Sequence, residues 1–122
     1  MKDLVVWFEI PTNDFQRAVK FYNFILETHI VIEEMQGQFM GFLQMAGYSD
    51  GGALISDENR KPSKDGTMIY LNGGEDLNII LKRVILAGGK IIQEKTLISK
   101  AIGYYGLFED TEGNQIALHS KH

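Results

Sequence analysis

The stretch "FEIPTNDFQRAVKFYNFIL", residues Phe8 to Leu26, carries the sequence signals of a strand, of a strand end and of a helix in direct succession. β-Forming residues from Leu4 to Ile10 run into Pro11, which predicts a strand that ends there. The next residues, "TND", are typical helix N-caps. Apolar residues then follow at the spacing of one helix face, at Phe15, Ala18, Val19, Tyr22, Ile25 and Leu26. The stretch therefore predicts a β-strand followed by a helix of about three turns.

The second half of the chain repeats this plan. A strand is predicted at Thr67 to Asn72, Glu75 and Asp76 can cap a helix, and the pair at 88–89 supplies the glycine that often ends one. The apolar face of this second helix has the same internal spacing as that of the first, so that Leu77 corresponds to Phe15. Its members are Leu77, Ile80, Leu81, Val84 and Ala87. The shared spacing indicates that one structural unit occurs twice.

Three further strands are predicted after each helix, at 29–34, 38–45 and 52–56 in the first half and at 90–95, 103–109 and 114–119 in the second. Each half then has the order β-α-β-β-β. We expect an α+β fold in one domain of 1–122, with module 1 at about 1–56, a polar linker at 57–66 and module 2 at about 67–122. Two such modules can form a curved, cup-shaped mixed sheet with the helices outside. A cup of this kind is a natural pocket.

Composition narrows the function. The 122 residues are 44% hydrophobic, which suits one compact domain. The net charge is 12 − 16 = −4, and without a dense Lys/Arg cluster nucleic acid is not an expected partner. The chain has no cysteine, which excludes disulfides and thiolate chemistry and fits a reducing cytoplasm. Apolar runs are too short for a membrane span, so we expect a cytoplasmic protein without a membrane partner.

Three stretches carry a family resemblance: Phe8 to Leu26 quoted above, "YLNGGEDLNIILKRVILAGGKI" from Tyr70 to Ile91, and "FEDTEGNQIALHS" from Phe108 to Ser120. In this order and spacing the chain resembles the vicinal oxygen chelate superfamily, also described as the glyoxalase / bleomycin-resistance / extradiol dioxygenase fold. The resemblance covers nearly the whole chain. It also implies a homodimer, whose symmetric interface across the sheets or the helices can complete the pocket.

The resemblance also implies where a metal would bind. Family members that use a divalent metal hold it with His, Glu or Gln from the first and last strand of each module. Carried over to this chain, the positions are Trp7, Ile55, Ile69 and Ala117. An indole, two branched alkyl chains and a methyl group offer a divalent ion no donor. We therefore expect no metal cofactor at the usual site, with a divalent metal at an atypical site as the alternative.

The period-two alternation of a strand predicts what else faces the cup. If Trp7 faces the cup, so does Glu9, and on the last strand Gln115, Ala117 and His119 share that face. A carboxylate beside an imidazole can orient the ring as a general base, which makes Glu9 and His119 candidate catalytic residues. A structural hydrogen bond between them, or two side chains at a wet rim, explains the same pattern.

The fifth strand has two possible orientations. Extending the repeat from the helices to the strands puts Ile69 and Leu71 in the cup, whereas side-chain polarity puts Tyr70 and Asn72 there. We prefer the polar pair, which could contact a ligand directly.

Two functional hypotheses follow. The first is a binding protein that holds a small, cationic or partly apolar molecule in the cup, as the resistance branch of the superfamily sequesters cationic drugs. The second is a metal-free acid–base enzyme that uses Glu9 and His119, or a glyoxalase-like lyase with an atypical divalent metal site. The expected partners are a small-molecule ligand and a second copy of the chain. The predicted ligand-binding residues are Trp7, Glu9, Ile55, Tyr70, Asn72, Ala117 and His119.

Overall fold

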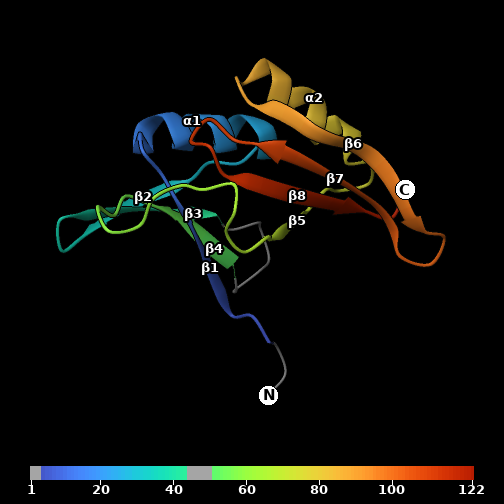
Figure 1. Ribbon diagram of the computed structural model, residues 1–122. Coiled ribbons are helices and arrows are strands. Elements are labelled where there is room, and N and C mark those ends of the chain that lie inside the picture. The colour runs from blue at the N-terminus through green and yellow to red at the C-terminus, as the bar shows by residue number, and fades with distance from the viewer. Residues whose placement is uncertain (1–3, 44–50) are drawn as a thin grey trace.

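The computed structural model describes residues 4–43 and 51–122, which form two βαβββ modules (Figure 1). Module 1 contains β1 (Trp7–Pro11), α1 (Phe15–Leu26), β2 (Val31–Met35), β3 (Gln38–Leu43) and β4 (Gly51–Ile55). Module 2 contains β5 (Tyr70–Asn72), α2 (Asn78–Leu86), β6 (Lys90–Ser99), β7 (Gly103–Glu109) and β8 (Gln115–Ser120). The predicted α+β fold and order of elements are confirmed. The strand predicted at 38–45 reaches Leu43, and its last two residues lie outside the described ranges.

Each module builds its own four-stranded mixed sheet, and the two sheets have the same topology. The strand orders are β1-β4-β3-β2 and β5-β8-β7-β6. In each sheet the first pair, β1 with β4 or β5 with β8, is parallel, and the other pairs are antiparallel. We expected one continuous curved sheet, whereas the described strands form two sheets without a shared ladder. Figure 1 shows α1 and α2 side by side on one side of these sheets.

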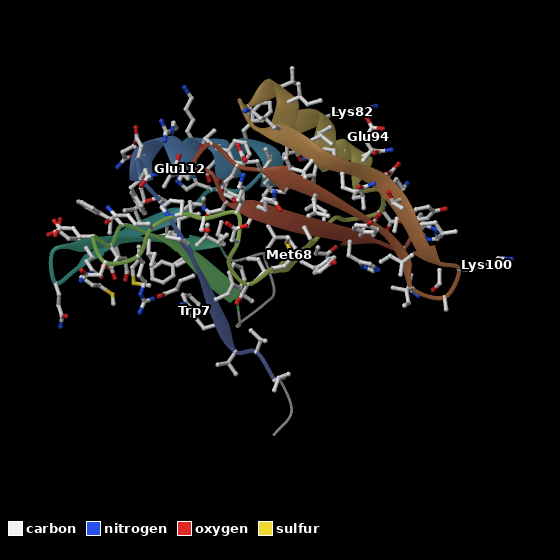
Figure 2. All side chains as sticks on the ribbon, in the orientation of Figure 1. Trp7, Met68, Lys82, Glu94, Lys100 and Glu112 are labelled. Atoms are coloured by element: carbon white, nitrogen blue, oxygen red, sulfur yellow. The ribbon has the colours of Figure 1, made fainter. Side chains whose placement is uncertain are left out.

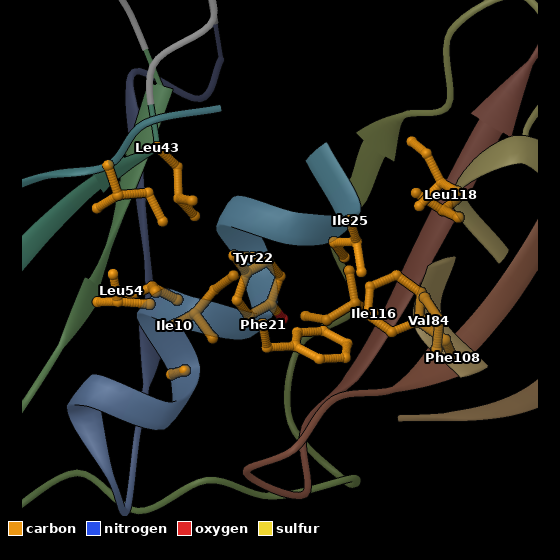
Figure 3. Packing of buried hydrophobic residues seen from close by; sticks show 14 of the residues in the cluster. Ile10, Phe21, Tyr22, Ile25, Leu43, Leu54, Val84, Phe108, Ile116 and Leu118 are labelled. Carbon is orange, nitrogen blue, oxygen red and sulfur yellow. The ribbon is translucent and has the colours of Figure 1, made fainter. Parts of the chain in front are cut away.

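One hydrophobic core joins the two modules, and α1 lies at its centre. The apolar face of α1 is buried, as its spacing predicted. Figure 3 shows Phe21, Tyr22 and Ile25 between residues of the first sheet, such as Leu54, and residues of the second, such as Phe108. Neither module buries its apolar face alone, so the modules stabilise each other through α1.

A buried carboxylate from module 2 binds the residues that lead into α1, whose N-cap is Asp14. Glu112, in the turn between β7 and β8, accepts hydrogen bonds from the backbone amides of Asn13 (2.9 Å) and Asp14 (2.7 Å). The Arg17 guanidinium pairs with it at 2.8 Å, and the Thr111 hydroxyl donates to it at 2.9 Å. A negative charge at a helix N-terminus interacts favourably with the helix dipole and satisfies amides that otherwise lack partners. Figure 2 shows Glu112 close to α1.

The same turn holds a second buried carboxylate, Asp110. The Tyr22 hydroxyl donates to Asp110 Oδ2 at 2.7 Å, and the amides of Glu112 and Asn114 donate to Oδ1 at 2.9 Å each. The Asn114 side chain bridges Asp110 and the carbonyl of Pro11. Burial, with the charge of Asp110 nearby, raises the pKa of Tyr22 well above its usual value. We call Tyr22, Asp110, Glu112 and Asn114 the clasp, because they tie the β7–β8 turn to module 1.

Candidate functional site

Each sheet has one face against the core and one face turned away from it, which we call its cup face. On module 1 the core side of the ladder includes Ile10 and Leu54. Alternation therefore places Trp7, Glu9 and Ile55 on the cup face, as predicted. Figure 2 shows Trp7 projecting from β1 on the side opposite the helices. Its ring meets that of Phe42 edge-on, with centroids 6.0 Å apart.

The cup face of module 2 carries the other four predicted ligand-binding residues. Tyr70 pairs with Ala117 and Asn72 with His119 in the parallel β5–β8 ladder, so all four share one face. The intervening Leu71 and Leu118 pack in or against the core. The structure therefore divides the predicted site in two, with three residues on one sheet and four on the other.

The assignment of Ile69 to the cup was wrong. Ile69 packs against the hydrophobic core, and the preference for the polar residues of the fifth strand agrees with the structure.

The reason is that the strands do not repeat with the spacing of the helices. The core-facing ladder pair of module 1, Ile10 with Leu54, corresponds to Leu71 with Leu118 in module 2. The helix spacing would instead match Ile10 to Asn72, a residue of the opposite face. In the ladders, Tyr70 is thus the structural counterpart of Glu9, because each directly precedes a core-facing residue.

A pocket of about 760 Å³ lies where β5 and β8 end. Tyr70, Asn72 and His119 line it, together with Ile98 and Ile102 from the β6–β7 hairpin. This volume lies within the range of small-molecule sites, and the lining combines these apolar side chains with polar and charged ones, including Glu75 and Lys121. The structure thus brings together three predicted ligand-binding residues in one cavity.

Two polar side chains of this pocket are held in fixed orientations. The Nε2 atom of His119 lies 2.6 Å from the carbonyl oxygen of Ile102. Because a carbonyl only accepts, Nε2 carries the proton of this bond, and Nδ1 is the other ring nitrogen available to a guest. The Oδ1 atom of Asn72 accepts from the amide of Gly74 at 2.9 Å, which orients the side-chain NH₂ group as a donor.

The two candidate catalytic residues have separate partners. Glu9 Oε1 accepts from Arg60 Nη1 at 2.7 Å, and Glu9 Oε2 accepts from the indole of Trp7 at 3.4 Å. The hydrogen-bond partner of the His119 ring is Ile102. Glu9 and His119 also lie on different sheets. The structure does not bring them together as an acid–base pair.

The positions at which members of the fold family hold a metal carry few oxygen or nitrogen donors in this chain. Trp7 and Ile55, the positions expected in module 1, carry no oxygen group. In the ladders Tyr70 with Ala117 corresponds to Glu9 with Ala53, so that Glu9 and Tyr70 are the oxygen donors among these four, whereas a divalent ion requires several such donors. Within residues 4–43 and 51–122, no three His, Asp or Glu side chains are grouped so that they could hold a metal ion.

The sequence did not indicate Arg60 or the Ile102 carbonyl as part of either cup face. Arg60 lies in a stretch whose polarity predicted a linker, and its partner is 51 residues away in the chain. Ile102 contributes a backbone oxygen, which has no sequence signature. The one feature of the sequence that could have indicated Arg60 is its positive charge within the linker between the two modules.

In the described part of the chain, no helix is long and apolar enough to cross a membrane. The family model for the Glyoxalase/Bleomycin resistance protein/Dioxygenase superfamily matches residues 4–118. A Glyoxylase-like domain-containing protein from Didymella fabae is 27% identical over 118 residues, which cover 90% of this chain and 88% of that protein.

Solved structures with this fold include a glyoxalase/bleomycin resistance protein from Albidiferax ferrireducens. It matches with a TM-score of 0.75 at 14% identity, over 98% of this chain and 100% of that one. A glyoxalase I variant from Zea mays matches with a TM-score of 0.74 at 19% identity, over 94% of this chain and 45% of that one. At these identities the two structures show that the fold is shared. What the chain binds or catalyses has to be argued from the residues of its own site.

Proposed function

Because this chain belongs to the Glyoxalase/Bleomycin resistance protein/Dioxygenase superfamily, we propose that it binds a small, partly apolar organic molecule at its cup faces. The observation that carries the proposal is the 760 Å³ pocket, which Tyr70, Asn72 and His119 line together. The small number of metal donors at the usual positions supports binding without a metal cofactor.

The side chains that line the pocket indicate which kind of molecule it can bind. Ile98 and Ile102 offer apolar contact, and both are partly exposed, at 44% and 53%. The oriented Asn72 amide can donate a hydrogen bond, and Nδ1 of His119 can accept one when it carries no proton. The pocket suits a guest with an apolar body and adjacent donor and acceptor groups.

Catalysis by His119 alone is the second candidate. A ring held by a backbone carbonyl is oriented as many general bases are, and this fixed contact at 2.6 Å is the observation that favours it. The separate partners of Glu9 and His119 do not support the paired mechanism. Loss of turnover in His119→Gln, with the guest still bound, would support catalysis by this residue.

We propose that the protein is a homodimer whose interface covers the β2 side of the module 1 cup face, at the opposite edge of the sheet from Glu9 on β1. Val31 is 58% exposed and Met35 is 48% exposed, and both share this face with Phe42. Exposed apolar residues of this kind, gathered on one face of a sheet, are typical of interaction surfaces. A cytoplasmic location and the absence of nucleic-acid and membrane partners remain predictions.

Calorimetric titration with a panel of small aromatic alcohols, amides, amines and acids tests the binding function. For a panel member that binds, we expect Asn72→Ala to weaken the affinity about five- to tenfold, because it removes one hydrogen bond to the guest. The control is Gln16→Ala, an exposed position on α1 that should leave the affinity unchanged. Equal affinities in the wild type and Asn72→Ala would place the guest elsewhere, and no binding by any panel member would contradict the proposal.

A further inference from the structure

The linker between the modules places a cation on the cup face of module 1. Arg60 Nη1 lies 2.7 Å from Glu9 Oε1, and Arg60 Nε lies 3.7 Å from Asp57 Oδ2. A carboxylate on this face would attract a cationic guest, yet Glu9 already has a guanidinium as its partner. The cation comes from the protein itself.

Both ends of this linker segment are fastened to the fold. At its start, the Ser56 hydroxyl accepts from the amide of Phe39 at 2.9 Å, and the Ser56 amide donates to the Phe39 carbonyl. At its end, the amide of Ser63 donates to Asn114 of the clasp at 3.2 Å. Arg60 lies between these two anchors, where Asp57 also orders the turn by accepting from the amide of Asn59. The linker thus keeps Arg60 near the cup face.

The contacts of Glu9 suit a carboxylate that binds a cation. The indole of Trp7 donates to one of its oxygens, and Arg60 takes the other. The Trp7–Phe42 pair supplies an aromatic wall on the same face. The Glu9 side chain is 29% exposed, whereas that of Arg60 is 60% exposed. The carboxylate is therefore held in place, while the guanidinium can exchange with solvent.

We propose that Arg60 is a tethered competitor that occupies the cation site of the module 1 cup face and sets its charge selectivity. An organic cation with an apolar body binds there by displacing Arg60 from Glu9. The inference rests on the proposed binding function at the cup faces, and it adds the residue that decides which charge the guest carries. Because exposed ion pairs contribute little stability, the tether is weak enough for a guest to replace.

Titration of the Trp7 fluorescence with phenethylamine and 3-phenylpropionate tests this proposal, since Trp7 is the one tryptophan of the chain. We expect Arg60→Gln to bind the amine about two- to fivefold more tightly than the wild type, because the competitor is gone. Glu9→Gln should lose affinity for the amine and gain affinity for the acid, because Arg60 is then unpaired with Glu9. The matched control is Lys61→Gln, which makes the same charge change one residue away.

Two results of this titration are decisive. Equal gains in amine affinity for Arg60→Gln and Lys61→Gln would overturn the tether, because net charge alone would then explain the effect. An absence of binding by every variant to either probe would overturn the proposed function at this face.

Limited trypsin digestion tests the tether without any guest. Trypsin cleaves after Arg60, and we expect Glu9→Gln to accelerate this cleavage about two- to fivefold by releasing the side chain. Cleavage after Arg83 within α2 monitors global unfolding in the same sample. The control is Glu33→Gln, which removes another carboxylate, on β2, from the same cup face. Equal rates after Arg60 in all three proteins would overturn the tether even if a guest binds.

Discussion

At the scale of single residues, the clasp makes stability depend on pH. Burial would raise the pKa of Glu112, but hydrogen bonds from Arg17, Asp14, Thr111 and Asn13 outweigh it and lower the pKa below its usual value. A carboxylate whose pKa is lower in the folded protein than in the unfolded protein stabilises the fold when it is ionised. This contribution is present above the unfolded pKa and is lost as the pH falls through the folded pKa.

We expect Glu112→Gln to lower the free energy of unfolding at pH 7 by about 1.5–3 kcal/mol, because charge-assisted hydrogen bonds to α1 are lost. Urea denaturation from pH 3 to pH 7 measures it. The difference between wild type and variant should shrink toward acid pH, where the wild-type carboxyl is protonated. Glu94→Gln, an exposed position on β6, is the control. A constant difference across this range would contradict the assigned role of the charge.

Residues 110–113 lie between the strands predicted at 103–109 and 114–119, and the sequence did not indicate that two of their charges are buried. The turn residues 110–114 have the composition of a solvent-exposed loop. Their burial depends on partners such as Tyr22, which lies 88 residues before Asp110. No local pattern reveals a contact at that separation, so the clasp becomes visible only in the folded chain.

At the scale of elements, β4 passes so close to β1 that one position has no room for a side chain. A Cβ atom at Gly52 would lie 2.5 Å from the carbonyl oxygen of Phe8 and 2.5 Å from its ring. Backbone on one side cannot move away as a flexible side chain can. We expect Gly52→Ala to destabilise the protein by about 1–3 kcal/mol through overpacking, as measured by urea denaturation. Gly66→Ala, with nothing within 4 Å of the new atom, should change the stability little.

The elements also show what a repeat in the sequence can predict. Helix faces follow the 3.6-residue period, so the shared spacing of the apolar residues placed both helices correctly. Strand register depends on hairpins and bulges, and β6 has register irregularities against β7 between Ile91 and Ser99. The extra residues in β6 shift the position of β8 in the sequence. The ladder counterpart of Leu54 is therefore Leu118 and not the residue that the helix spacing indicates. Ile69 was assigned to the wrong face for a similar reason, because the residues of β5 also do not follow the spacing of the helices.

At the scale of the whole molecule, the proposed homodimer predicts which surface holds two copies together. We expect the wild type to sediment as a dimer in analytical ultracentrifugation and Val31→Glu to sediment as a monomer, because the charge would be buried in the interface. Ile79→Glu, at a position that is 50% exposed on α2, tests the helix side. Dissociation by Ile79→Glu alone would place the interface at the helices, and a monomeric wild type would contradict the homodimer.

The overall architecture was the most predictable property of this protein, because it rests on element order and on two amphipathic helices. The separation into two sheets was not predictable, since it depends on how α1 packs between them. The candidate site shows the same division. Alternation along single strands assigned Glu9 and His119 to cup faces, and side-chain polarity assigned Asn72, whereas which of them meet was decided by tertiary packing.

The central claim is that a small organic guest binds in the pocket at the ends of β5 and β8. Amide chemical-shift mapping by NMR, during titration with a panel member that binds, tests it most directly. We expect saturable shifts at 70–72, 74–75, 98, 102 and 119–122, the residues that line this pocket. Shifts confined to the groove between α1 and α2, which Phe24 and Leu86 line, would contradict it.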